Sequence, residues 1–152
     1  MFNYSIMPLD TEHVEEICQD IKEQYESGVS NCALFYVKLV PEGNPLIPKA
    51  EQQCEKFDIF RKKLESMGLT CGILAQCTMG HGYPLDVPPS LTRLKNLTNG
   101  KETNSFCPAD QNFREYLRHS FSVLAAHKPA HIMLDDDFRL IRRGGKGCAC
   151  DS

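Results

Sequence analysis

Apolar residues along the chain predict three helices and three strands in alternation. In residues 11–27, 50–67 and 110–126, apolar side chains recur every three or four positions, the spacing that places them on one face of a helix. Short apolar runs alternate with these segments and predict strands; they lie at residues 33–40, 69–78 and 130–134. Helices that alternate with strands favour parallel pairing through right-handed crossovers, which defines an α/β fold.

A long polar stretch separates the second predicted strand from the third predicted helix. Residues 79–108 are rich in Gly, Pro, Asn and Thr and are too long for a routine connection. We expect a functional or mobile loop that lies over the carboxyl ends of the strands. The chain has 152 residues, enough for one domain with a core but short for two. Residues 1–152 are therefore interpreted as a single α/β unit.

Two architectures fit this alternation. One is a small open three-layer α/β sheet, and the other is a (β/α)₈ TIM barrel, which takes about 250 residues. The predicted strand and helix steps amount to less than half of a barrel, and they end in a loop directly after a strand. We therefore predict the first βα repeats of a larger barrel, with the open sheet as the alternative.

Alternation within the strands places polar side chains at one shared edge. Each predicted strand has one apolar face and a second face that becomes polar toward its carboxyl end. Ligands of parallel α/β proteins bind at these carboxyl ends. The candidates on the strands are Lys38, Gln76, Thr78, Asp135 and Asp137, and the loops beyond add Glu42, His81, Arg139 and Cys107.

The run Asp135-Asp136-Asp137 follows what reads as a buried strand. Adjacent carboxylates repel each other, so we expect the pKa of one or more of them to be raised. Proteins accept this arrangement where carboxylates do chemistry, bind a cation or hold a polar ligand. By parity Asp136 points away from the other two, as a helix cap or a supporting group, and it stays among the binding candidates. The alternative is that the run starts a loop and one aspartate caps a turn.

Phrases along nearly the whole chain resemble bacterial glycoside-hydrolase-like TIM-barrel proteins. The more specific phrase is the acidic segment at residues 135–140 together with Gly-Cys-Ala-Cys at residues 147–150. Weaker phrases lie at residues 40–45, 80–82, 106–108 and 113–117. The resemblance implies a (β/α)₈ fold, of which this chain is the N-terminal portion, and a carbohydrate ligand at the strand ends. It does not supply a catalytic pair.

Most glycosidases use two carboxyl groups, one as an acid and the other as a nucleophile or base. Asp135 and Asp137, two positions apart on a strand, would lie about 6–7 Å apart and are the catalytic candidates. The two groups more often come from different strands. Either aspartate is therefore assigned as a general acid/base or a hydroxyl binder, its partner is expected outside this chain, and the chain alone is expected to be inactive. The substrate-binding candidates are Lys38, Glu42, Gln76, Thr78, His81, Asp136 and Arg139.

The alternative function is metal binding or a non-catalytic ligand-binding module. The chain has eight cysteines, and its N-terminus does not read as a secretory signal, so we expect a cytoplasmic protein with reduced thiols. Five cysteines fall in apolar patterns and are interpreted as core residues: Cys18, Cys32, Cys54, Cys71 and Cys77. The loop cysteines Cys107, Cys148 and Cys150 could bind zinc together with His81, and the aspartates suit magnesium or calcium. On the main interpretation no cofactor is expected.

Charge and hydropathy narrow the range of partners. The net charge is −3, with acidic and basic residues mixed along the chain. No basic stripe points to nucleic acid, and no polybasic segment or apolar run of about 20 residues points to a membrane. The expected partner is a carbohydrate. An incomplete barrel would also expose strand edges, through which a homodimer is expected to form.

Overall fold

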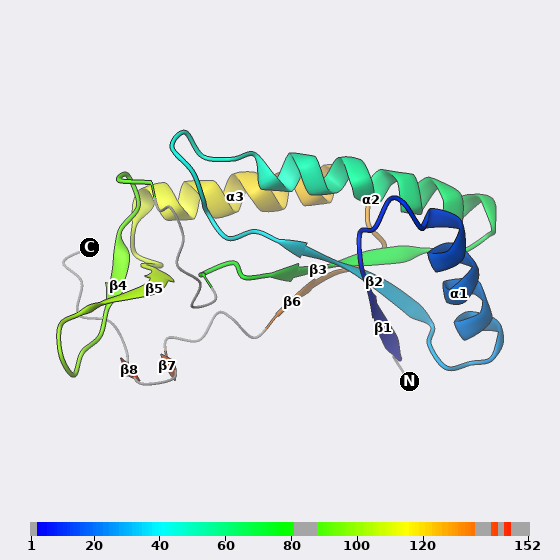
Figure 1. The fold of residues 1–152 in the computed structure, drawn as a ribbon, viewed down its shortest axis with the longest axis horizontal. Helices are drawn as coiled ribbons and strands as arrows, with labels where there is room; N and C mark the ends of the chain where they lie inside the picture. The colour runs from blue at the N-terminus through cyan, green and yellow to red at the C-terminus, as the bar shows by residue number, and fades with distance from the viewer. Residues whose placement is uncertain (1–2, 81–87, 136–140, 143–144, 147–152) are drawn as a thin grey trace.

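A parallel four-stranded sheet forms the centre of the computed structural model, which describes residues 3–80, 88–135, 141–142 and 145–146 (Figure 1). The strands lie in the order β1 (Tyr4–Met7), β2 (Cys32–Lys38), β3 (Cys71–Gln76) and β6 (Ile132–Leu134). Three helices connect them: α1 (Val14–Glu26), α2 (Lys49–Ser66) and α3 (Gln111–Ala126). The predicted α/β class, the three helices and the parallel pairing are confirmed.

The strand β1 is absent from the sequence-based prediction. It pairs in parallel with the start of β2, from Tyr4 beside Cys32 to Met7 beside Phe35. Four residues give too short a pattern to distinguish a strand from a loop by alternation. The chain therefore begins its described part with a strand, and its first unit is βα rather than a helix alone.

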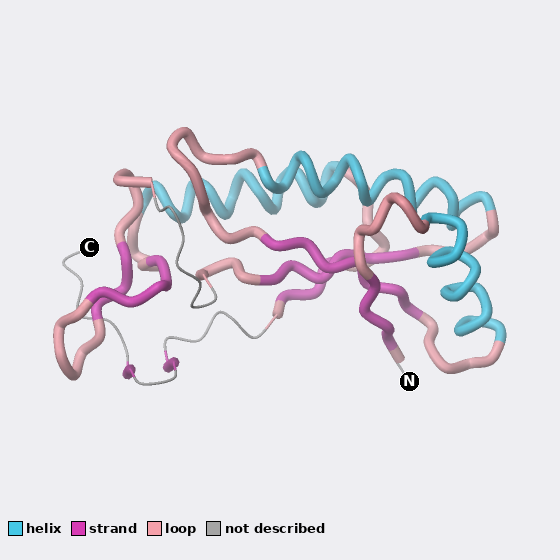
Figure 2. Tube along the Cα trace, in the orientation of Figure 1, coloured by secondary structure: helices cyan, strands magenta, loops and turns pink. Residues whose placement is uncertain are grey.

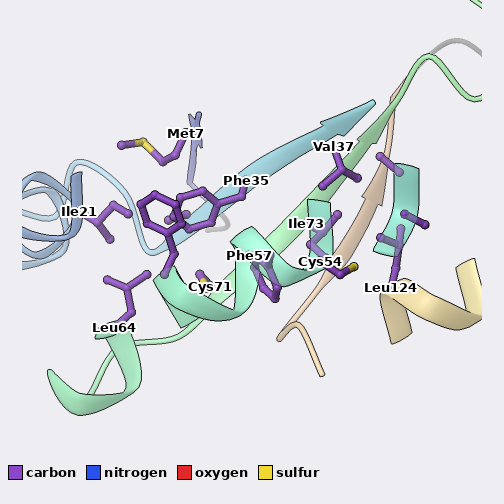
Figure 3. Packing of buried hydrophobic residues seen from close by; sticks show 14 of the residues in the cluster. Met7, Ile21, Phe35, Val37, Cys54, Phe57, Leu64, Cys71, Ile73 and Leu124 are labelled. Atoms are coloured by element: carbon purple, nitrogen blue, oxygen red, sulfur yellow. The ribbon is translucent and has the colours of Figure 1, made fainter. Parts of the chain in front are cut away.

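The three helices pack against the same face of the sheet. The core beneath them joins β2 and β3 to all three helices through buried apolar side chains (Figure 3). Phe35 of β2 lies between two α2 rings, with centroids 6.0 Å from Phe57 and 4.6 Å from Phe60. The described residues thus form two layers, helices on sheet, and the sheet is open, with β1 and β6 at its edges. These described elements fit the small open α/β sheet, and they do not form a closed barrel.

The opposite face of the sheet carries a smaller apolar group. Leu34 and Leu74 are buried there, and Tyr36 and Met133 pack against them. No residue of the three described helices belongs to this group. We call this side of the sheet the open face.

The prediction that the last strand is buried is wrong for its helix-side residues. Ile132 and Leu134 are 38% and 51% exposed. The strand β6 is an edge strand, and α3, which precedes it, packs mainly along α2. No described helix therefore covers the outer side of β6.

The stretch predicted as a long loop contains an antiparallel hairpin. It consists of β4 (Arg93–Lys95) and β5 (Glu102–Phe106), and a second short hairpin is formed by β7 (Ile141–Arg142) and β8 (Gly145–Lys146). Figures 1 and 2 show the β4–β5 hairpin at the end of the molecule toward which β2 and β3 run. The hairpin therefore lies on the side of the molecule to which the carboxyl ends of β2 and β3 point.

Apolar side chains attach the β4–β5 hairpin to the sheet and to α3. Phe106 of β5 stacks on Phe113 of α3 with ring centroids 5.3 Å apart. Asp110, the N-cap of α3, accepts hydrogen bonds from the backbone N–H groups of Asn112 and Phe113, and its other oxygen accepts one from Thr92. One aspartate therefore both starts the helix and holds the hairpin.

Candidate functional site

Three polar side chains follow one another across neighbouring strands at the carboxyl end of the sheet. Lys38 of β2 is paired in register with Gln76 of β3. On the other side of β3, Leu134 is paired with Ala75, and the backbone N–H of Asp135 donates to the Ala75 carbonyl at 3.1 Å. Asp135 thus stands level with Gln76. We call Lys38, Gln76 and Asp135 the polar row.

The polar row belongs to the open face. Side chains alternate along a strand, so Lys38 shares its face with Tyr36, and Gln76 shares its face with Leu74. Tyr36 and Leu74 belong to the open-face apolar group. Because neighbouring strands lie about 4.8 Å apart, the row extends about 10 Å from Lys38 to Asp135 at the level of the backbone.

An apolar row lies directly behind the polar one. Tyr36, Leu74 and Met133 are paired in register across the same three strands. Leu34, which lies two residues before Tyr36 on the same face of β2, is completely buried. The site therefore combines a cation, an amide and a carboxylate with an apolar floor that contains an aromatic ring.

A residue of α2 fixes the end of β2 that carries Lys38. The pairing with β1 stops at Phe35, so the backbone of Lys38 has no strand partner on that side. The side-chain amide of Gln53 replaces it. Its Oε1 accepts from the Lys38 N–H at 2.7 Å, and its Nε2 donates to the Lys38 carbonyl at 2.8 Å. Across the strand, the N–H of Leu39 donates to the Gln76 carbonyl at 2.9 Å.

The polar row is accessible from outside. Lys38 is exposed, and Gln76 and Asp135 are half-buried. The Lys38 ammonium lies 5.9 Å from the centre of the Tyr36 ring, within the range of a cation–π contact. These groups can donate to and accept from a polar ligand, and Asp135 can also serve as an acid or a base.

The structure places three other sequence-predicted residues away from the row. Glu42 forms an ion pair with Lys49 at the start of α2, at 2.5 Å. Thr78 is 1% exposed and lies beyond the end of β3. The chain leaves the strand direction at Cys77, whose φ is +56°, so alternation no longer decides which way Thr78 points. Cys107 is buried in the apolar group beneath the β4–β5 hairpin.

Six predicted residues lie outside the described residues. They are His81, Asp136, Asp137, Arg139, Cys148 and Cys150. The polar row therefore contains one of the two catalytic candidates, Asp135. The position of Asp137 relative to it stays a prediction.

The described residues were also searched for a metal centre. In this part of the chain, no group of three or more His, Cys, Asp or Glu side chains is arranged to hold a metal ion. The five cysteines interpreted as core residues, Cys18, Cys32, Cys54, Cys71 and Cys77, are indeed buried. Burial raises the pKa of both Cys54 and Cys71 to about 12, which keeps these thiols protonated and makes them poor metal ligands.

Sequence reasoning missed two residues that shape the site. Tyr36 stands two positions before Lys38, which puts it on the same face of the strand, so an aromatic ring beside a polar strand end was the available signal. No sequence signal identifies Gln53, because its role depends on where the short strand β1 stops. It lies on α2 and reaches the backbone of β2 only in the folded chain.

Two further findings bear on identity. Within the described ranges, no helix combines the length and the apolar composition needed to cross a membrane. A comparison of the whole chain with family models and with curated protein sequences finds no match.

Proposed function

We propose that this chain is a glycoside-hydrolase-like protein that binds or acts on a carbohydrate at the carboxyl end of its parallel sheet. The observation that carries the proposal is the polar row, in which Lys38, Gln76 and Asp135 stand side by side on three strands. The resemblance of residues 135–140 and 147–150 to glycoside-hydrolase-like TIM-barrel proteins points in the same direction.

The chemistry of the row suits a polyhydroxylated ligand. An amide both donates and accepts hydrogen bonds, and a carboxylate accepts them, so Gln76 and Asp135 match the hydroxyl groups of a sugar. The apolar row behind them offers Tyr36 and Leu74 to the C–H faces of a sugar ring. Ligand sites commonly combine such an apolar wall with a few placed polar groups.

The strand order supports a site at the carboxyl ends. The four strands follow one another in sequence order, so the described sheet has no point at which the order reverses. Open doubly wound sheets bind ligands at such a reversal, whereas barrels bind them across the carboxyl ends of successive strands. We propose that the four strands belong to a (β/α)₈ arrangement whose helices all lie on one face.

In this proposal Asp135 is the acid/base candidate of the row and Asp137 is the second candidate. A glycosidase of the usual kind needs two carboxyl groups on either side of the glycosidic bond. The polar row supplies one of them. Binding is therefore the activity that the row itself supports, and the chain alone is expected to bind sugar without hydrolysing it.

Binding to a glycan array tests the proposal. Replacing Gln76 with Ala removes about two hydrogen bonds to sugar, each worth about 0.5–1.5 kcal/mol, and should weaken binding roughly tenfold. Asp135→Asn should weaken it by a similar factor. The matched controls are Gln52→Ala on α2 and Asp20→Asn on α1, two exposed positions outside the row. The proposal fails if the chain binds no glycan, or if the row variants bind as well as their controls.

A further inference from the structure

We infer that the carbohydrate recognised by the polar row is anionic, and that Lys38 binds its carboxylate, sulfate or phosphate group. This inference rests on the proposed function and adds the ligand class. It is carried by the charge order of the row and by the way the chain holds the Lys38 ammonium.

The charges of the row are ordered along it. Lys38 provides a cation on β2, Gln76 a neutral amide on β3, and Asp135 a carboxyl group beyond β6. An anionic substituent is attracted to the β2 end and repelled from the β6 end. A sugar with one such group would therefore bind in a single direction, with its hydroxyl groups toward Gln76 and Asp135.

Lys38 differs from three lysines of the described chain that are held by carboxylates. Lys22, Lys49 and Lys63 form ion pairs with Glu26, Glu42 and Glu15 respectively. For Lys38 the described residues provide no such carboxylate, and the ammonium instead faces the Tyr36 ring at 5.9 Å. Its positive charge thus remains available to a ligand.

The backbone and the ring together restrict where this ammonium goes. Gln53 binds both the N–H and the carbonyl of Lys38, which fixes the residue at the end of β2. Tyr36, two positions earlier on the same face, attracts the ammonium over the open face. Ligand binding then loses less side-chain freedom than it would with an unrestrained lysine.

A neutral sugar can accept hydrogen bonds from this ammonium but leaves its positive charge without a counter-charge. Lys38 is exposed, so a ligand that covers its ammonium removes water from the charge, and an anionic group compensates that loss better than a neutral hydroxyl group does. The structure therefore favours a ligand whose negative charge compensates Lys38. A hydrogen bond between charged partners is stronger than a neutral one and adds about tenfold in affinity.

The test compares matched anionic and neutral oligosaccharides. The array carries uronate, sulfated and phosphorylated oligosaccharides beside their neutral counterparts, and bound glycans are titrated by calorimetry at low and at physiological salt. We expect the anionic member of a pair to bind about tenfold more tightly at low salt, and this preference to shrink as salt screens the charge. Lys38→Gln should abolish the preference for the anionic member, and Lys38→Arg should keep most of it.

The control is Lys62→Gln, which removes an exposed lysine of α2 and should leave the preference intact. Thermal unfolding of each variant verifies that it is folded. Equal affinity for anionic and neutral sugars, or a preference that survives Lys38→Gln, overturns this inference but leaves the proposed function standing. Absence of binding to any glycan overturns both. Inorganic phosphate that binds as tightly as the anionic sugars would show a simple anion site and would also overturn the inference.

Discussion

Gly72 is the position where a single added methyl group should do most harm to the sheet. A Cβ atom built on Gly72 would lie 2.7 Å from the carbonyl oxygen of His131 and 2.8 Å from Cδ2 of Leu34. Both distances are shorter than carbon atoms tolerate in proteins. Leu34 is completely buried, and the His131 carbonyl belongs to the backbone beside β6, so neither neighbour can give way freely. Gly72→Ala should therefore push β6 away from β3.

The size of the effect follows from the bonds at that point. The Ile73 N–H donates to the His131 carbonyl, and the Ala130 N–H donates to the Cys71 carbonyl, each at 2.9 Å. Losing two such bonds costs about 2 kcal/mol, and overpacking at a buried site costs a further 1–3 kcal/mol where the chain cannot relax. We expect the free energy of unfolding to fall by about 3–5 kcal/mol.

Urea unfolding, monitored by circular dichroism, measures this loss of stability. Hydrogen exchange of the Ile73 amide directly reports the hydrogen bond between β3 and the backbone of His131. The control is Thr70→Ala, an exposed position just before β3. Displacement of β6 also moves Asp135 away from Gln76, so the proposed sugar binding should weaken in the same variant. A loss below about 0.5 kcal/mol, with Ile73 as protected as in the unchanged chain, would refute the packing argument.

Two further predictions follow from shifted pKa values. Burial raises the pKa of Cys54 and Cys71 to about 12, so alkylation at pH 8 should label both thiols only after unfolding, and native stability should decline as the pH rises above about 9; mass mapping that finds them labelled in the native chain would contradict this. Burial of Asp110 acts to raise its pKa. Hydrogen bonds from Thr92 and from the backbone N–H groups of Phe113 and Asn112 outweigh that effect, so the pKa is lowered. The resulting stability is complete above the unfolded-state value near 3.8 and is lost as the pH falls through the folded-state value. Asp110→Ala should lower the free energy of unfolding by about 1–2 kcal/mol at pH 7 and by less at pH 3, as urea titrations at the two pH values can measure; an equal loss at both would argue against the ionised cap.

The sequence predicts the elements whose patterns are long. The three helices are confirmed with ends that shift by at most a few residues, because each has at least three turns of helical spacing. Alternation along β2 and β3 correctly separates the helix-side residues from the open face, since both are regular strands that pair with each other over six positions and with a further strand on their other side. The same alternation places Lys38, Gln76 and Asp135 at the carboxyl ends of neighbouring strands, where the strand register puts them side by side.

The missed features depend on contacts between distant segments. β1 is a strand because β2 offers it an edge, and its own four residues carry little signal. β6 was predicted to be buried from its apolar composition, but burial depends on which helix covers it, and Ile132 and Leu134 remain exposed. The β4–β5 hairpin is held by Phe106 on Phe113 and by Asp110, contacts that link a polar stretch to a helix and cannot be read from either alone.

The sequential strand order has a consequence for how the chain assembles during synthesis. Each strand of the sheet after β1 pairs with one that left the ribosome before it, so β1, β2 and β3 can assemble with α1 and α2 while the rest of the chain is still being made. β6 arrives last, after the hairpin and α3. The polar row is thus completed by the final strand of the sheet to join, and a nascent chain stalled before residue 130 would carry Lys38 and Gln76 but no Asp135.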